Sequence, residues 1–132
     1  MANLRRTMTV RRLDEGIDEE AAHILGQGPV HPRLRDSVLC FTAELAQQRL
    51  LTAYTALLGR ANQGGASAAA CGRLADGIVR RISRFADSAT TRRDCLTWLI
   101  SAPQDQLRRA EQEVALLARA LRNIVQDQAK TA

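Results

Sequence analysis

Two long stretches of this chain carry apolar residues at alternating steps of four and three residues. This spacing forms a heptad seam, the stripe along which one α-helix packs against another. The first seam consists of Leu39, Ala43, Ala46, Leu50, Ala53 and Leu57, and the second of Leu107, Ala110, Val114, Leu117, Leu121 and Ile124. Because the seams match in kind and length, the sequence predicts two long helices, over about residues 32–60 and 102–126, packed antiparallel.

The first of these stretches is apolar on more than one face. A second stripe runs beside its seam, through Leu34, Val38, Phe41, Leu45, Leu51, Tyr54 and Leu58. A surface helix needs only one apolar face. We therefore expect the helix over 32–60 to be the central helix of the fold, or one half of a dimer interface.

Shorter helical patterns over about residues 13–25, 67–86 and 91–101 complete the expected fold. No stretch shows the alternation of β-branched and polar residues that a strand requires, and aromatic residues make up only 3% of the chain. The sequence therefore predicts an all-α fold, a small bundle of four to five helices.

Three N-cap candidates mark the starts of the later helices. Ser67 precedes the third helix, Thr91 stands three residues before Asp94, and Ser101 stands three residues before Gln104. The last two spacings match the capping box, in which the hydroxyl accepts a hydrogen bond from a backbone N–H of the first turn.

The length of 132 residues, 45% of them hydrophobic, fits one domain with a modest core. We expect residues 1–12 to form a mobile basic arm, residues 13–126 a single helical domain, and residues 127–132 a tail.

Neither a signal peptide nor a membrane span is expected, because no apolar run reaches the length of either. Cys40, Cys71 and Cys95 are far apart, and each has apolar neighbours at helical spacing. This pattern favours buried thiols in a reducing compartment over disulfides, and so favours a cytoplasmic protein.

The residues that carry catalytic or metal chemistry are sparse. His23 and His31 are the only histidines, and no cysteine stands at ligand spacing from either. The carboxylates over residues 14–20 fit the solvated first turns of a helix, and Gly64 and Gly65 lack the spacing and the lysine of a phosphate-binding loop. We therefore expect no metal, no cofactor, no small-molecule substrate and no catalysis.

Residues 11–20, which begin with the pair Arg11-Arg12 and contain the step Ile17-Asp18, are similar to the opening of helical chorismate mutases, whose first helix places an arginine and an Ile-Asp step similarly. That family also needs a lysine in the substrate site, whereas the only lysine of this chain is Lys130, near its end. The expected helix also ends at Gly26, short of the family's long first helix. No residue role is therefore assigned from this resemblance.

Arginine outnumbers lysine 18 to 1, and the net charge is +5. Such a charge favours anionic partners, although a high-GC genome also enriches arginine without functional demand. In the third helix, Arg73, Arg80 and Arg84 fall on the face opposite the apolar stripe, and Arg81 lies at its flank. Together with Arg92 and Arg93, which open the next helix, they form the candidate contact for phosphate or for an acidic protein.

Two functions fit these patterns. The first is a small cytoplasmic regulatory protein that binds another protein, such as a transcription factor or a secreted substrate, or a second copy of itself, as antiactivators, adaptors and chaperones do. Its candidate helix interface consists of Leu39, Leu50, Tyr54, Leu57, Trp98, Leu117 and Leu121. The alternative is a DNA-binding transcriptional regulator that uses the arginines of the third and fourth helices.

Overall fold

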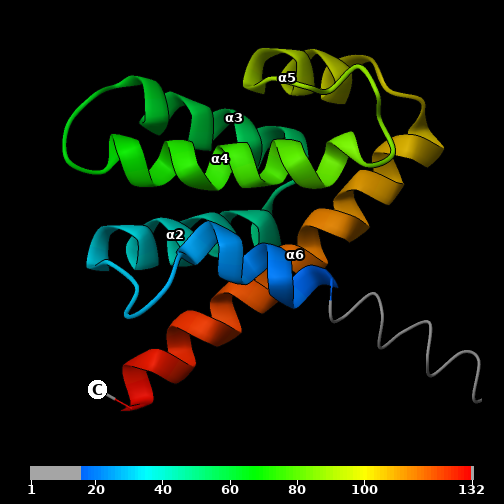
Figure 1. Cartoon of the computed structure of the whole chain (residues 1–132). Coiled ribbons are helices and arrows are strands. Elements are labelled where there is room, and N and C mark those ends of the chain that lie inside the picture. The colour runs from blue at the N-terminus through cyan, green and yellow to red at the C-terminus, as the bar shows by residue number, and fades with distance from the viewer. Residues whose placement is uncertain (1–15, 132) are drawn as a thin grey trace, which may run out of the picture.

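The computed structural model describes residues 16–131, and every regular element in that range is an α-helix (Figure 1). The predicted all-α fold is therefore confirmed for this part of the chain. A helical segment over residues 16–25, here called the N-terminal helix, is followed by α2 (Pro32–Gln47), α3 (Leu50–Asn62), α4 (Ala68–Ser83), α5 (Arg92–Ser101) and α6 (Gln104–Thr131). The expected arm, residues 1–12, lies outside the described residues.

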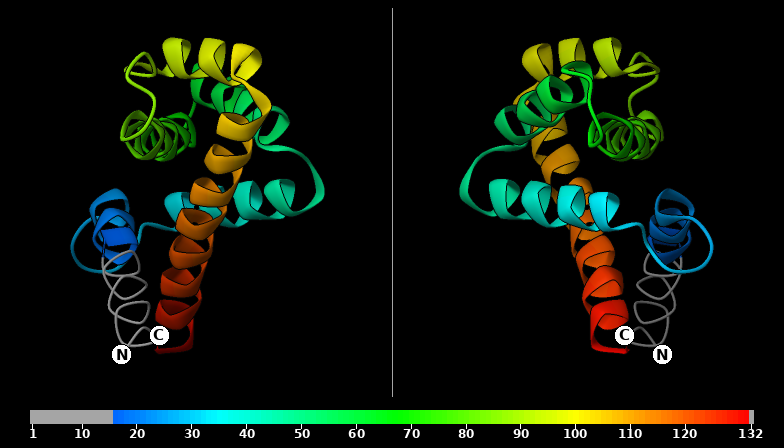
Figure 2. Two further views of the ribbon diagram at one scale, coloured as in Figure 1. Left: turned by 90° about the vertical axis from the view of Figure 1, so that its right-hand side faces the viewer. Right: turned by 90° about the vertical axis from the view of Figure 1, so that its left-hand side faces the viewer.

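The helix α4 lies at the centre and contacts α2, α3, α5 and α6. The helices α3 and α4 run side by side as a hairpin, α5 lies across their outer side, and α2 and the N-terminal helix lie on the opposite side of α4 (Figure 1). The long α6 runs from the level of α5 past α2 and so spans the molecule (Figure 2). No helix among residues 16–131 combines the length and the apolar character that crossing a membrane requires.

The single helix expected over 32–60 is wrong, because the chain breaks between α2 and α3. Gln48 (φ −133°, ψ 167°) and Arg49 (φ −75°, ψ 159°) are extended, and α3 starts afresh at Leu50. A straight helix would hold its two apolar stripes on different faces and could not bury both against one core. The break lets α2 turn its second stripe inward, while α3 turns both stripes toward the core.

The first predicted seam is correct only after the break. Leu50, Ala53 and Leu57 in α3 are buried, as expected. In α2 the buried residues instead belong to the second stripe, Leu34, Val38 and Phe41. Leu39, which the seam placed at an interface between the two long helices, is 36% exposed, and Ala43 and Ala46 are exposed with it.

The second seam is correct along most of α6. Ala110, Val114, Leu117 and Leu121 are buried, and Leu107 and Ile124 are partly buried against the core. The antiparallel pair of long helices is nevertheless absent, since α6 crosses the shorter α2 instead of lying along it (Figures 1 and 2). The helix continues to Thr131, through most of the residues expected to form a tail.

The caps are a mixture of correct and wrong predictions. The Thr91 hydroxyl accepts a hydrogen bond from the Asp94 N–H at 3.0 Å, as expected. Ser67 precedes α4 but makes no side-chain cap. The capping box at Ser101 is wrong, because Ser101 belongs to α5 and its hydroxyl donates to the Thr97 carbonyl at 2.9 Å. Pro103 and its carbonyl, which accepts from the Leu107 N–H, open α6 instead.

Candidate functional site

The predicted arginine patch on α4 and α5 is largely neutralised within the molecule. Arg81, expected at a flank, is buried between three helices. Its Nη1 donates to Glu20 of the N-terminal helix at 3.1 Å, and its Nε donates to Glu113 of α6 at 3.0 Å. Arg84 pairs with the other oxygen of Glu20. Arg81 is therefore out of reach of a partner, whereas the Arg84 side chain stays 57% exposed beside its ion pair.

Arg92 is held in a similar way. Its Nε and Nη2 donate to the two oxygens of Asp76 at 2.6 and 3.0 Å, a bidentate pair. This hydrogen bonding lowers the pKa of Asp76 below its ordinary value. The guanidinium also lies against Gly72, where an added Cβ would come within 2.7 Å of Arg92 Nη2. Glycine at this position therefore lets the Arg92–Asp76 pair lie flat on α4.

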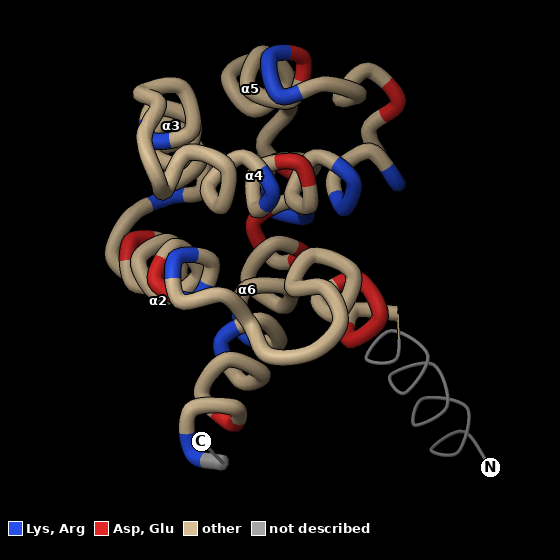
Figure 3. The backbone as a smooth tube through the Cα atoms, turned by 60° about the vertical axis from the view of Figure 1, so that its left-hand side comes forward, with Lys and Arg blue, Asp and Glu red and all other residues tan. Residues whose placement is uncertain are grey.

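Of the six candidate arginines, Arg80 and Arg93 are exposed and form no ion pair among the described residues, and Arg73 donates only to the His23 carbonyl, at 3.4 Å. Acidic stretches of the N-terminal helix and of α6 face the basic side of α4 (Figure 3). The six residues thus form scattered cations instead of one continuous patch.

Unpaired positive charge instead lies on the outer face of α6. Arg108, Arg119 and Arg122 are exposed and form no ion pair among residues 16–131. The local sequence explains this for Arg119, because the residues one turn before and after it are Ala115, Leu116, Arg122 and Asn123. Arg109 is different, since its guanidinium stacks on the Phe85 ring at 4.7 Å.

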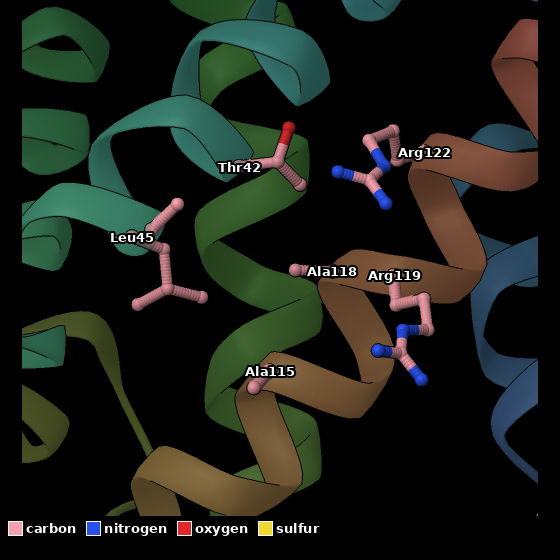
Figure 4. Close-up of a pocket in the computed structure, with 7 residues that line it drawn as sticks. Thr42, Leu45, Ala115, Ala118, Arg119 and Arg122 are labelled. Carbon is pink, nitrogen blue, oxygen red and sulfur yellow. The ribbon is translucent and has the colours of Figure 1, made fainter.

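A hollow of about 210 Å³ lies between α2 and α6, beside these arginines. We call it the α2–α6 groove; its lining residues are Thr42, Leu45, Ala46, Ala115, Ala118, Arg119 and Arg122. Arg122 points toward Thr42 across the groove, and Arg119 stands on the same side of α6, one turn away (Figure 4). Leucine and alanine side chains make the floor of the groove apolar, and Arg119 and Arg122 make its rim positively charged. No carboxylate is among the lining residues.

The apolar surface continues on both sides of the groove. On α2, the exposed Leu39, Ala43 and Ala46 extend it along the helix. On α6, Leu116 is 42% exposed and lines a second hollow of about 320 Å³ against the N-terminal helix. Arg119 lines both hollows, but the second one also has the polar side chains of Asp18 and Asn123 in its wall, so the apolar surface there is limited to Ile17, Leu116 and Ala120.

The structure places most of the candidate interface residues in the core. Leu50, Tyr54, Leu57, Leu117 and Leu121 are buried. Trp98 is partly buried and packs edge to face on Phe85, with ring centroids 6.0 Å apart. Only Leu39 remains on an open surface.

The groove residues on α6 were not predicted from the sequence. The nearest signal in the sequence is Leu116, a residue of the second hollow, which interrupts the polar side of α6 between Gln112 and Arg119. The groove also depends on the crossing of α2 and α6, which no local pattern contains.

The described residues hold no group of three or more His, Cys, Asp or Glu side chains placed to bind a metal ion. Comparisons of the chain with protein-family models, with curated proteins and with solved structures found no match.

Proposed function

We propose that this protein is a small cytoplasmic regulatory or adaptor protein that acts by binding, with the α2–α6 groove holding an acidic, amphipathic helix of another protein. The observation that carries the proposal is the pairing of an apolar floor with two arginines, Arg119 and Arg122, that have no carboxylate partner among the described residues. An exposed apolar strip with a one-sign rim is the form that helix-binding grooves take.

The chemistry of the groove supports a helical occupant. Ala46, Ala115 and Ala118 are small, so the backbone of a third helix can come close to both α2 and α6. Ala115, Ala118 and Arg122 repeat at steps of three and four and therefore share one face of α6. Arginine pairs well with carboxylates, which favours glutamate or aspartate along the flank of the occupant.

The DNA-binding alternative has less support from the contacts. Arg81, Arg84 and Arg92 already bind carboxylates, and a phosphate would have to displace those partners. Arg80 and Arg93 remain as candidate phosphate contacts. Arg73 forms no ion pair among the described residues either, so three cations remain, and these would give only a weak, salt-sensitive affinity.

The test compares three forms of the full chain. The wild type is measured beside the groove variant, R119E with R122E, and beside the control variant, R80E with R93E. The control changes the same number of exposed, unpaired arginines, so the two variants carry the same net charge. The probe is a synthetic amphipathic peptide helix with leucines on one face and glutamates on its flanks, and its twin carries lysine in place of each glutamate.

We expect the glutamate peptide to bind the wild type and the control variant, and to bind the groove variant at least tenfold more weakly, as measured by calorimetry. The lysine twin should not bind. Equal binding to all three forms, or no binding to the wild type, would overturn the proposal. If duplex DNA binds the wild type at low salt, and only R80E with R93E abolishes that binding, the result would establish the DNA-binding alternative instead.

A further inference from the structure

A separate hollow of about 330 Å³ lies where α2 and α4 begin. Its lining residues come from two segments, His31, Arg33 and Leu34 from the start of α2, and Ala66, Ala69, Ala70 and Arg73 from the loop and first turns of α4. None of these residues takes part in the α2–α6 groove. The volume is at the lower end of the range for small-molecule sites, about 300–1,000 Å³.

The hollow has two positive charges and no negative one among its lining residues. Arg33 forms no ion pair in the described part of the chain, even with Asp36 one turn away. The carboxylate one turn after Arg73 is Asp76, which is already bound by Arg92. Arg73 donates to the His23 carbonyl at 3.4 Å and forms no ion pair with any carboxylate among the described residues. The field in this concave site is therefore positive.

Neutral donors stand beside the two arginines. His31 Nδ1 accepts a hydrogen bond from the Arg33 N–H at 3.2 Å, so the neutral ring carries its proton on Nε2, the nitrogen left to donate elsewhere. The amides of Ala69 and Ala70 precede the first α-helical hydrogen bond of α4, from Cys71 N–H to the Ser67 carbonyl, and the Ser67 side chain does not cap them. These donors belong to residues that line the hollow, whose charge comes from the arginines.

The rest of the wall is apolar. Leu34 is buried, and Ala66, Ala69 and Ala70 contribute only methyl groups and backbone. An inorganic anion would leave this part of the hollow without contacts, whereas an organic anion would cover it.

We propose that this hollow binds a small organic anion whose phosphate or carboxylate group lies between Arg33 and Arg73 and whose apolar body packs on Leu34 and the three alanines. No small-molecule substrate was expected from the sequence, because residues with catalytic or metal chemistry are sparse. Arg33 and Arg73 lie forty residues apart in the chain, and they line one hollow only because α2 packs on α4. This site does not depend on the α2–α6 groove, and either can fail without the other.

The experiment uses the full chain and three probes: phenyl phosphate, benzoate and inorganic phosphate. Two variants act on different parts of the hollow. R33A with R73A removes both charges, and A69L keeps the charges but fills the apolar side. R80A is the control, because Arg80 is an exposed, unpaired arginine of the same helix outside the hollow.

We expect phenyl phosphate or benzoate to bind the wild type and R80A with a Kd of about 1 mM or tighter, measured by NMR titration. Whichever of these two probes binds more tightly identifies the preferred anionic group, phosphate or carboxylate. R33A with R73A should weaken that binding at least tenfold, and A69L should weaken it severalfold while leaving inorganic phosphate unaffected.

Three results would overturn the proposal. The first is the absence of saturable binding of both organic probes to the wild type. The second is an equal loss of affinity in R80A, which would indicate a general attraction of anions. The third is inorganic phosphate binding as tightly as phenyl phosphate, which would mean that the apolar wall makes no contact. Circular dichroism of each variant checks that its fold is retained.

Discussion

Arg81 of α4 and Glu113 of α6 form an ion pair in which the arginine side chain is only 4% exposed. The same guanidinium also binds Glu20, so one side chain joins the N-terminal helix, α4 and α6. Taking these charges out of water is costly, and the mutual attraction offsets that cost only while all partners are present. The triad is therefore a point at which a single change has a large effect.

Replacing Arg81 by methionine should destabilise the fold by about 3 kcal/mol, because Glu20 and Glu113 then face each other without their shared cation. Arg84→Ala is the comparison, since its side chain is 57% exposed and its pair with Glu20 should contribute less than about 1 kcal/mol. Urea denaturation measures both. Adding E20Q and E113Q to R81M should restore part of the lost stability, because the unpaired buried carboxylates are then neutral. Equal destabilisation by R81M and R84A would contradict the special role of Arg81.

The position of Arg81 shows a limit of prediction from sequence. Helical periodicity correctly put Arg73, Arg80 and Arg84 on the exposed side of α4, and Arg81 beside the apolar stripe. A flank position becomes buried only when another element covers it. Here Glu20 and Glu113 come from helices 61 and 32 residues away, and local spacing contains no information about that meeting.

A second close approach occurs at Gly77, where α4 meets the N-terminal helix. A Cβ at this position would lie 2.5 Å from Ile24 Cγ1. Gly77→Ala should therefore cost about 1–3 kcal/mol through overpacking, although alanine is the better helix former. Gly59→Ala is the matched control, because Gly59 is also inside a helix and has nothing within 4 Å of an added Cβ. Thermal unfolding should show that Gly59→Ala raises the free energy of unfolding by about 0.5–1 kcal/mol. If both variants raised it, α4 and the N-terminal helix would pack less closely at Gly77.

The broken helix over 32–62 also separates what sequence can and cannot predict. Apolar spacing identified the buried apolar positions of α2 and α3, because both stripes of this region are present in the pattern, but it did not identify the buried Ser37. It could not decide which stripe faces the core in which half, and the extended Gln48 and Arg49 carry no proline or glycine that would announce a break. The sequence did not predict the groove for the same reason, because its pattern places Leu39 and Ala46 in a buried seam, whereas both lie at an open surface.

Two serine and threonine caps that look alike in sequence should behave differently. Thr91→Ala removes a hydrogen bond to the Asp94 N–H and should destabilise α5 by about 1 kcal/mol. Ser67→Ala removes no cap, because the Ser67 side chain makes no such bond, and should change stability by less than about 0.5 kcal/mol. Chemical denaturation of the two variants checks the difference. A larger effect for Ser67→Ala would show that its hydroxyl caps α4 in solution.

Alkaline pH should destabilise the fold through two buried groups, Cys95 and Tyr54. Burial raises the pKa of the Cys95 thiol from 9.0 to about 11, and burial likewise raises the pKa of Tyr54 well above its ordinary 10.0. Between pH 9 and 11 the unfolded chain therefore loses protons that the native state keeps, so the free energy of unfolding falls as pH rises, by up to about 1.4 kcal/mol per pH unit for each group. Cys95→Ala should flatten this slope above pH 9, whatever its effect at pH 7.

Tyr54 is the only tyrosine, so the absorbance of tyrosinate near 295 nm reports its ionisation directly. That absorbance should appear only together with the loss of helical circular dichroism, and its appearance near pH 10 in a folded chain would mean that water reaches the Tyr54 hydroxyl.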